Sequence, residues 1–499
     1  SNPERRQRMN GVIIGLLAIA LAVSMTLNIT GLRDSDSLER PDNERRSVAV
    51  LPFESLSNNP DNLLFANGIH DDLTTKLANI GTFKVISRTS VMEYLDSSKP
   101  VQQIADELGV NTVLAGTVQR VGDNVRINMQ LIDVSSGDHL WAESFDRRLT
   151  VADIFDIQSE ISRSIAREMQ VAMNSAATLQ LATIPTADLR AYSLYTAGKN
   201  NLYLRRRETL LEARQQFQAA LDIDPDYAEA YVGLAQSVML LMINHQELSR
   251  SDAQRMTAET LDKALELGPN SADAYATLGL MKSDSWSQYR LSNEDLEAEQ
   301  AFEKALSLNP NHASALMWYA SLRDSQQRTA EAISLYEQSL ALDPLGRIPW
   351  SNLPGLYAQQ GRNQAAIDAW VKAVEIHPEW PTPYGYLATH LAGMGRLDEA
   401  LAWYVQARNL SSDPFIGSNI AAGIYYEFGD LQRAREQFVR LPQDHPFAPL
   451  GIAFTTLIDG DAEGALAHLD AGIEAGYELP RFAYAVTSDV ALVLGQYEK

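Results

Sequence analysis

Three consecutive residues, His70, Asp71 and Asp72, carry the side chains that metal sites and acid–base catalysis use. A neutral imidazole and two carboxylates could together bind a divalent cation. The three residues lie on a segment with helical periodicity, where consecutive positions point about 100° apart and cannot converge on one ion. Position i+4 from His70 is Thr74, which supplies no second imidazole. We therefore expect a solvated helix face rather than a metal site.

No other stretch of the chain matches a catalytic motif. There is no Gly-rich phosphate loop, no HExxH and no G-x-S-x-G. The eight histidines are never paired at i+4, and the absence of cysteine excludes disulfides and thiolate chemistry. We predict that the chain is not an enzyme and uses no cofactor and no metal. The alternative is an enzyme with an unrecognised site in the groove of the helical repeats described below.

The overall charge bears on partners. The 499 residues carry a formal net charge of -23, which argues against nucleic acid as a partner of this chain, because phosphate contacts need clustered Lys and Arg. A chain of this length is too long for one core, so we expect at least two domains.

The segment 47–172 is predicted to form an α/β domain. We expect strands at 48–53 and 83–86, a helix between them with a stripe of apolar residues from Phe65 to Ile80, and a short helix at 100–108 that ends at Gly109. Strand-like runs at 112–120, 125–134 and 139–145 predict an antiparallel meander, followed by a helix over about 151–173.

Three blocks of this segment carry a resemblance to a known family. They are AVLPFESLSNNPDNLLFANGIHDDL, GVNTVLAGTVQRVGDNVRINMQLIDVSSGDHLWAESFDR and DIFDIQSEI. In this order and spacing they resemble the domain related to the amino-terminal part of TolB. That resemblance implies a non-catalytic domain that associates with other proteins, often just outside a bacterial inner membrane.

The first 46 residues are predicted to attach the chain to a membrane. Residues 1–9 form a basic stub that we interpret as the cytoplasmic end of a missing upstream region, and 10–32 form an uncharged run long enough for a transmembrane helix. A cleaved signal peptide is the competing interpretation. Residues 33–46 are a polar linker. Either interpretation places the bulk of the chain in the periplasm, and the first makes it a single-pass inner-membrane protein.

After a second linker at 173–190, internal repeats dominate residues 191–499. Similar sequence segments end at Pro225, Pro269, Pro310, Pro344 and Pro378, at intervals of 44, 41, 34 and 34 residues. A 34-residue period with two helices per unit resembles the tetratricopeptide (TPR) repeat. We count about eight units and one partial unit. Within a unit, small residues let two helices approach and large ones fill the gaps, with Gly361 as one inter-helix turn; Pro354 is expected to kink its helix or delay its start.

Stacked helix pairs form an all-α superhelix with a concave groove. The resemblance implies that the first helices line the groove, where Ser321, Asp324, Gln359 and Thr389 are the candidates for peptide contact. The tryptophans at these helical spacings are expected in the core rather than in a ligand site.

The combination resembles the outer half of CadC/ToxR-type membrane-integrated regulators. It implies a membrane-anchored scaffold or sensor for signal transduction in bacteria, with a protein or peptide in the groove, the bilayer at 10–32 and a second copy of the chain as partners. The alternative is the outer half of a nucleotide-cyclase-type signalling protein. In both cases the upstream output domain lies before Ser1.

Overall fold

The computed structural model describes residues 46–411 apart from 56–59, 123, 149, 172, 174–177, 179–180, 246 and 284–292, and then 425, 430–438, 448–461 and 463–468. The predicted stub, the span at 10–32 and all but the last residue of the linker at 33–46 lie outside these residues. Within them, none of the helices combines the length and the hydropathy that a bilayer crossing requires. The predicted membrane attachment therefore stays a prediction.

The first half of the described chain is an α/β domain. Its strands are β1 (Ser47–Val50), β2 (Glu54–Ser55), β3 (Lys84–Val85), β4 (Thr112–Val121), β5 (Asn124–Asp133) and β6 (His139–Arg148). Its helices are α2 (Pro60–Ile80), α3 (Arg88–Met92), α4 (Val101–Leu108) and α5 (Val151–Glu168).

These strands form one mixed sheet in the order β3-β1-β4-β5-β6, with β2 also paired to β4. β1 runs parallel to β3 and β4, whereas β4, β5 and β6 form an antiparallel meander. Because successive strand residues point to opposite faces, Val48 and Val50 pack with α2 and α5, while Ala49 and Leu51 pack with α3 and α4. The core of the domain therefore has a layer on each side of β1.

The elements expected in this domain are present, with shifted ends. The inward residues of β5, from Val125 to Leu131, are all buried, as their alternation with polar residues predicts. Gly109 caps α4 in the left-handed conformation with φ 63°. The last helix ends earlier than expected, at Glu168, because the chain reverses at Gln170 with a positive φ. The helix α3 was not predicted.

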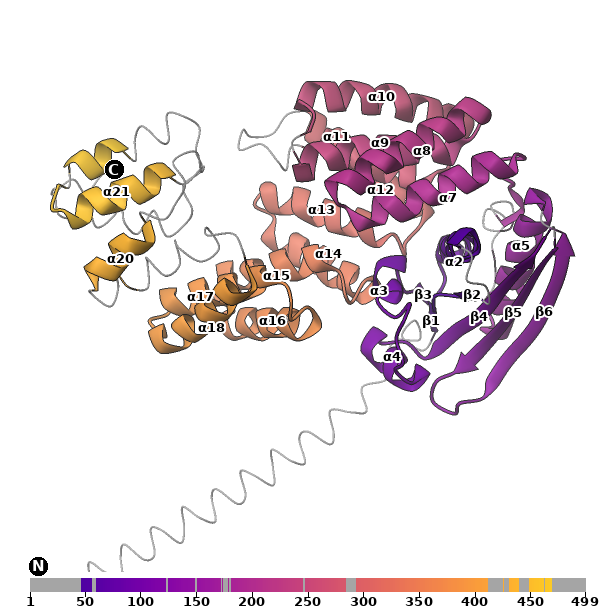
Figure 1. Ribbon diagram of the computed structural model, residues 1–499, viewed down its shortest axis with the longest axis horizontal. Coiled ribbons are helices and arrows are strands. Elements are labelled where there is room, and N and C mark those ends of the chain that lie inside the picture. Colours follow the sequence, from indigo (N-terminus) through magenta and orange to yellow (C-terminus); the bar gives the residue numbers. More distant parts are fainter. Residues whose placement is uncertain are drawn as a thin grey trace, which may run out of the picture.

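The second half is a row of paired helices. They are α7 (Leu189–Leu204), α8 (Arg207–Ile223), α9 (Ala228–His245), α10 (Arg250–Leu267), α11 (Ala272–Lys282), α12 (Asn293–Leu308), α13 (Ala313–Ser325), α14 (Thr329–Leu342), α15 (Arg347–Gln359), α16 (Asn363–Ile376), α17 (Pro381–Gly393) and α18 (Leu397–Leu410). Shorter described helices follow at α20 (Leu431–Phe438) and α21 (Ala448–Ile458). Figure 1 shows the pairs stacked in an arc that starts beside the α/β domain and leads away from it.

The packing inside the pairs follows the expected small-and-large pattern. The ring of Phe217 fits between Gly198 and Gly233, where an added Cβ would lie 2.7 Å and 2.5 Å from the ring. Gly361 makes its turn with φ 73°, a conformation that costs glycine little. α15 begins seven residues before Pro354 and continues past it, so the expected late start is wrong.

The α/β domain docks on the repeats along α2 and α7. At Gly68 an added Cβ would lie 2.5 Å from Cγ2 of Thr196, so the two helix backbones approach closely. Tyr192 and Leu189 from α7 join the hydrophobic core of the α/β domain. The described part of the predicted linker at 173–190 also packs, since Leu181 is buried and its carbonyl accepts from Ser159.

Two inter-repeat turns make further contacts with the α/β domain. Before α13, Nδ2 of Asn311 donates to the carbonyl oxygens of Ala78 at 3.1 Å and Phe83 at 2.9 Å. Before α15, a carboxylate oxygen of Asp343 accepts from the hydroxyls of Ser87 at 2.6 Å and Ser90 at 2.5 Å. The domain is therefore attached to the repeats at three places that are far apart in the sequence.

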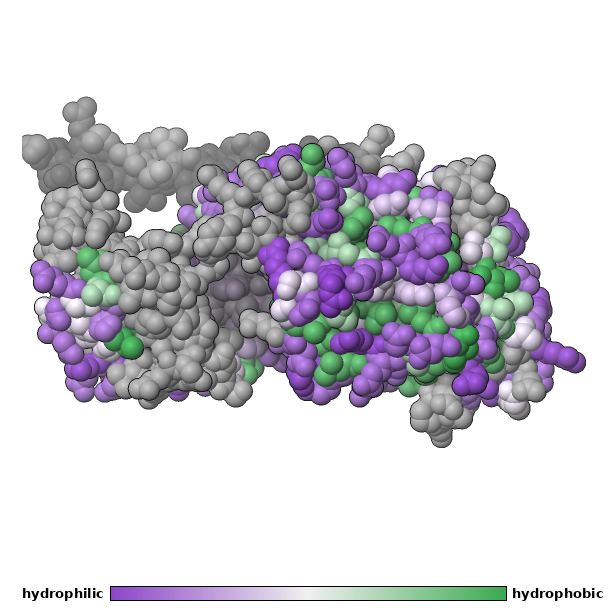
Figure 2. Space-filling model, turned by 90° about the horizontal axis from the view of Figure 1, so that it is seen from above, coloured by the Kyte–Doolittle hydropathy of each residue, from purple (hydrophilic) through white to green (hydrophobic). Residues whose placement is uncertain are grey.

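The surface is chemically mixed on the face drawn in Figure 2. Hydrophobic residues lie there in patches separated by hydrophilic ones. A broad apolar surface would indicate a protein interface, and the described residues visible on this face do not form one.

Candidate functional site

The concave side of the repeats contains a cavity of about 520 Å³, which we call the groove cavity. Its lining comes mainly from the first helices of three repeats: α9 supplies Ile243 and Asn244, α13 supplies Trp318 and α15 supplies Ser351. The lining mixes aliphatic, aromatic and neutral polar groups with the charged Arg205 and Asp324. Such a mixture suits a peptide, whose backbone needs hydrogen bonds and whose side chains need apolar contacts.

A hydrogen-bonded triad forms one wall of the groove cavity. The hydroxyl of Tyr336 lies 2.8 Å from that of Ser321 and accepts from Nδ2 of Asn352 at 2.9 Å. Burial raises the pKa of Tyr336, so the phenol stays protonated at neutral pH. The triad joins α13, α14 and α15 and fixes the positions of three groove-lining side chains.

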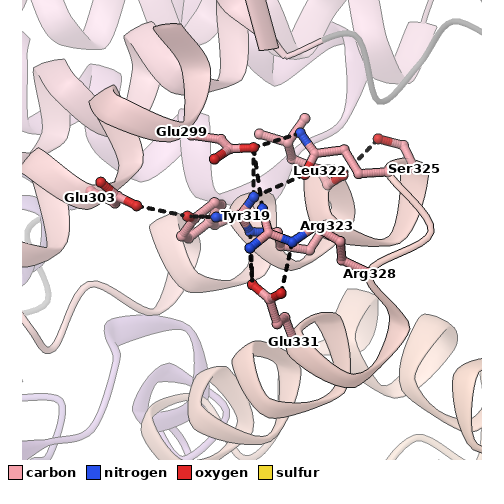
Figure 3. Close-up of polar contacts among 9 residues, drawn as sticks. Glu299, Glu303, Tyr319, Leu322, Arg323, Ser325, Arg328 and Glu331 are labelled. Atoms are coloured by element: carbon pink, nitrogen blue, oxygen red, sulfur yellow. Dashed lines mark hydrogen bonds and ion pairs between the residues drawn. The ribbon is translucent and has the colours of Figure 1, made fainter. Parts of the chain in front are cut away.

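Behind the groove, a network around Arg323 joins α12, α13 and α14 (Figure 3). Arg323 is 4% exposed, and its Nη1 lies 2.6 Å from Oε1 of Glu299 on α12. Its Nε lies 3.4 Å from Oε2 of Glu331 on α14, which Arg328 also binds through two nitrogens at 2.7 Å. The guanidinium of Arg323 also donates to the hydroxyl of Tyr319. Because a buried charge is costly unless paired, this network holds the three helices in one geometry.

Of the four residues predicted to contact a peptide, two line the groove cavity and two do not. Ser321 and Asp324 are both in the lining. Gln359 and Thr389 are exposed but lie outside that lining, and the hydroxyl of Thr389 donates to the carbonyl of Gly385. The peptide contact itself stays a prediction for all four.

Other groove residues were not singled out from the sequence. Trp318 and Asn352 occupy equivalent places 34 residues apart, and both line the groove cavity. Trp318 is buried at 8% exposure, as expected of a core tryptophan, but Trp380 lies in the lining and is half-buried. The repeat register could have found Trp318 and Asn352, because a position that faces the groove in one unit faces it in the next.

His70 and Asp71 are buried and Asp72 is partly buried, so the expectation of a solvated helix face is wrong. Nε2 of His70 lies 2.8 Å from the carbonyl oxygen of Val50 in the sheet. Asp72 turns toward α5 and α7, where it accepts from Gln158 at 3.0 Å and from the hydroxyl of Tyr192 at 2.7 Å. The α2 helix is covered on several sides, by the sheet, α5 and α7, and each member of the triplet contacts a different neighbour.

Asp71 is the centre of a buried ionic group that we call the interdomain cluster, made of Asp71, Arg88, Lys199 and Tyr203. Nζ of Lys199 lies 3.2 Å from Oδ2 of Asp71, and Nε of Arg88 lies 3.5 Å from Oδ1. The hydroxyl of Tyr203 donates to Oδ1 at 3.1 Å, and the Arg88 guanidinium lies over its ring, 4.4 Å from the centroid. Two residues come from each domain, so the cluster joins them.

Burial and neighbouring charges both shift the pKa values of the triplet, and on Asp71 they act in opposite directions. Burial would raise the pKa of Asp71, but Lys199 and Arg88 outweigh it and hold the pKa below its ordinary value. Burial raises the pKa of Asp72 to about 6 and lowers the pKa of His70 to about 4. His70 is therefore neutral at physiological pH. Among the residues that the structure describes, no group of three His, Asp or Glu side chains is placed to hold a metal ion.

Comparison with known families matches both halves of the chain. Residues 44–164 match the family described as HilA/YgeH-like transcriptional regulator, second domain. Residues 296–347 and 326–382 match the tetratricopeptide repeat. The chain carries a HilA-like regulator domain followed by tetratricopeptide repeats. The matched domain is named for a regulator rather than for TolB, so the TolB resemblance stays an interpretation.

A curated relative is "Putative adenylate cyclase 3" of Rhizobium meliloti (strain 1021), 31% identical over 237 residues. The match covers 48% of this chain and 40% of the relative, so it spans well under half the relative's length.

Two solved structures are similar to this chain, both with TM-scores below 0.5. One, titled "Functional Characterization of Pseudomonas Aeruginosa pilF", is 20% identical with a TM-score of 0.36 and covers 44% of this chain and 92% of its own. The other, yeast Tom70, is 15% identical with a TM-score of 0.41 and covers 87% of this chain and 85% of its own.

Proposed function

We propose that the chain is a scaffold or sensor whose superhelix binds a protein or peptide in the groove cavity. The observation that carries this proposal is a cavity of about 520 Å³ lined by the first helices α9, α13 and α15 and braced by the Ser321–Tyr336–Asn352 triad. A preorganised groove binds more tightly because less side-chain entropy is lost on binding. TPR repeats support protein binding, and a HilA-like regulator domain supports a role in transcriptional regulation.

The finer part of the proposal concerns place and output. The chain is proposed to be anchored by residues 10–32 in the inner membrane, with its bulk in the periplasm, as the non-catalytic sensory half of a CadC/ToxR-type regulator with a TolB-like domain. The net charge of -23 supports an input role, because the chain itself is a poor ligand for DNA. A second copy of the chain is a further candidate partner, which light scattering of the purified protein would test.

Groove binding is tested by selecting peptides on the wild-type chain and measuring them against two charged variants. Ile348→Glu places a carboxylate in the groove cavity, where Ile348 is 38% exposed. Leu296→Glu makes the same change on α12, where Leu296 is 60% exposed and outside the cavity lining. We expect the selected peptides to bind Ile348→Glu at least about tenfold more weakly, because a desolvated carboxylate is costly.

The control variant Leu296→Glu should bind the same peptides as tightly as the wild type. Equal affinity of both variants, measured by fluorescence anisotropy, would place the peptide elsewhere and end the groove assignment.

A second candidate is the outer half of a nucleotide-cyclase-type signalling protein. The similarity to a relative named as a putative adenylate cyclase favours it. Reading the native gene upstream of the codon for Ser1 separates the two candidates. A winged-helix domain there supports the regulator, a cyclase domain supports the second candidate, and a native start at Met9 contradicts both.

A further inference from the structure

A second cavity, of about 150 Å³, lies between the two domains, and we call it the interdomain cavity. Its charged lining consists of Arg88 on α3, Lys199 and Arg205 at and just beyond the end of α7, and the carboxylates of Asp71 and Asp273. The α/β domain closes one side and the repeats close the other. It adjoins the groove cavity, because Arg205, Leu240 and Trp318 line both.

The carboxylates that line the interdomain cavity are already engaged. Asp71 binds Arg88 and Lys199 within the interdomain cluster. Asp273 lies 3.2 Å from Nε2 of His312. The three lining cations therefore exceed the two lining carboxylates, and the cavity favours an anion.

Arg205 is the cation with no assigned partner. Among the described residues its guanidinium makes no hydrogen bond and no ion pair within 4.0 Å. The charge of Asp343 acts on it, but that carboxylate already accepts from the hydroxyls of Ser87 and Ser90. Partial burial lowers the pKa of Arg205 without discharging it, so this guanidinium is available to an anion in the cavity.

One buried donor beside Arg88 is also unsatisfied. Nδ2 of Asn200 finds no hydrogen-bond acceptor in the described part of the chain, whereas Nε of Arg88 faces Oδ1 of Asp71 at 3.5 Å. The two side chains touch each other, because Nη2 of Arg88 donates to Oδ1 of Asn200. Buried N–H groups without acceptors are rare in folded proteins, and an unrecorded water or anion is a usual explanation. Asn200 therefore adds a donor without an acceptor beside the Arg88 end of the cavity.

We propose that the interdomain cavity binds a small organic carboxylate, held by Arg205 and by the Arg88 side of the interdomain cluster. A guanidinium and a carboxylate form two parallel hydrogen bonds, which the uncommitted Arg205 can supply. The cavity volume suits a ligand about the size of benzene, which filled an engineered cavity of comparable volume. Such a ligand contacts both domains at once, so its binding stabilises their association. Arg205 also lines the groove cavity, so the two sites share one side chain.

The test is calorimetric titration of the full chain with acetate, malonate and inorganic phosphate at constant ionic strength. Saturable binding of acetate or malonate is expected, with slowed amide hydrogen exchange in both α3 and α7. Arg205→Gln should weaken it at least about tenfold. The matched control is Arg206→Gln, which removes the exposed neighbouring arginine and should leave the affinity unchanged within about twofold.

Circular dichroism checks that each variant is folded. If Arg205→Gln does not fold, Arg205→Lys keeps the charge but loses the fork of donors, and the carboxylate should then bind several-fold more weakly. Absence of saturable binding by both carboxylates overturns the proposal. So does carboxylate binding that neither Arg205 variant weakens, and so does binding of phosphate alone.

Discussion

Replacing Asp71 by Asn tests whether the interdomain cluster holds the two domains together. The carboxylate is the shared partner of Arg88 and Lys199, and the three side chains are only 9%, 9% and 14% exposed. Removing one partner of a buried ion pair costs about 3–5 kcal/mol, because the remaining charge is left unpaired. Asn keeps the shape of the side chain and can still accept a hydrogen bond from Tyr203. We therefore expect the free energy of unfolding to decrease by about 3 kcal/mol.

The loss should appear as a lower melting temperature of the chain, measured by circular dichroism at 222 nm. At about 2 °C per kcal/mol for a protein of this size, the expected decrease is about 6 °C. The control is Asp146→Asn, which breaks an ion pair with Arg126 at 63% and 57% exposure and should leave the melting temperature unchanged.

The effect of Asp71→Asn should also depend on pH. Because the folded-state pKa of Asp71 is below its ordinary value, the stabilisation is complete above the ordinary carboxylate pKa of about 3.9 and is lost as the pH falls through the lower folded value. The difference between wild type and variant should therefore persist from about pH 8 to 5 and narrow below about pH 4. A melting temperature for Asp71→Asn equal to that of Asp146→Asn would show that the cluster does not stabilise the interface.

Two further substitutions probe the same interface from different sides. The raised pKa of Asp72, about 6, means that the wild type loses stability as the pH rises from about 4 to 6. Asp72→Asn should therefore be more stable than wild type at pH 7, by up to about 3 kcal/mol, and equally stable near pH 4. Urea unfolding at both pH values measures this difference. A variant less stable than wild type at pH 7 would contradict the prediction. Gly68→Ala places a Cβ 2.5 Å from Cγ2 of Thr196, and this overpacking should lower the free energy of unfolding by about 1–3 kcal/mol. The control Gly355→Ala, with open space around its Cβ, should not lower it. Similar melting temperatures for the two variants would refute the close approach of α2 and α7.

Local patterns in the sequence predict most of the elements, because local physics determines them. The alternation from Val125 to Leu131 indicates β5, and the 34-residue spacing indicates the repeats before any contact is known. The prediction failed where burial depends on a second domain. His70 to Asp72 have the polarity of a solvated helix face. The sheet buries His70, and the docking of α7 on α2 covers Asp71 and Asp72. Gln359 and Thr389 fail to reach the groove cavity for a similar reason, since its extent depends on how several repeats curve.

The three attachments of the α/β domain have a mechanical consequence. A stack of helix pairs ordinarily flexes like a spring, because each pair touches only its neighbours. Here α7, the turn before α13 and the turn before α15 are all tied to one small sheet domain, so the curvature between them is locked. The helix pairs from α7 to α15 are therefore held at a fixed curvature. A force applied to the helix pairs beyond α15 would therefore be transmitted to the α/β domain as a rotation of a rigid unit.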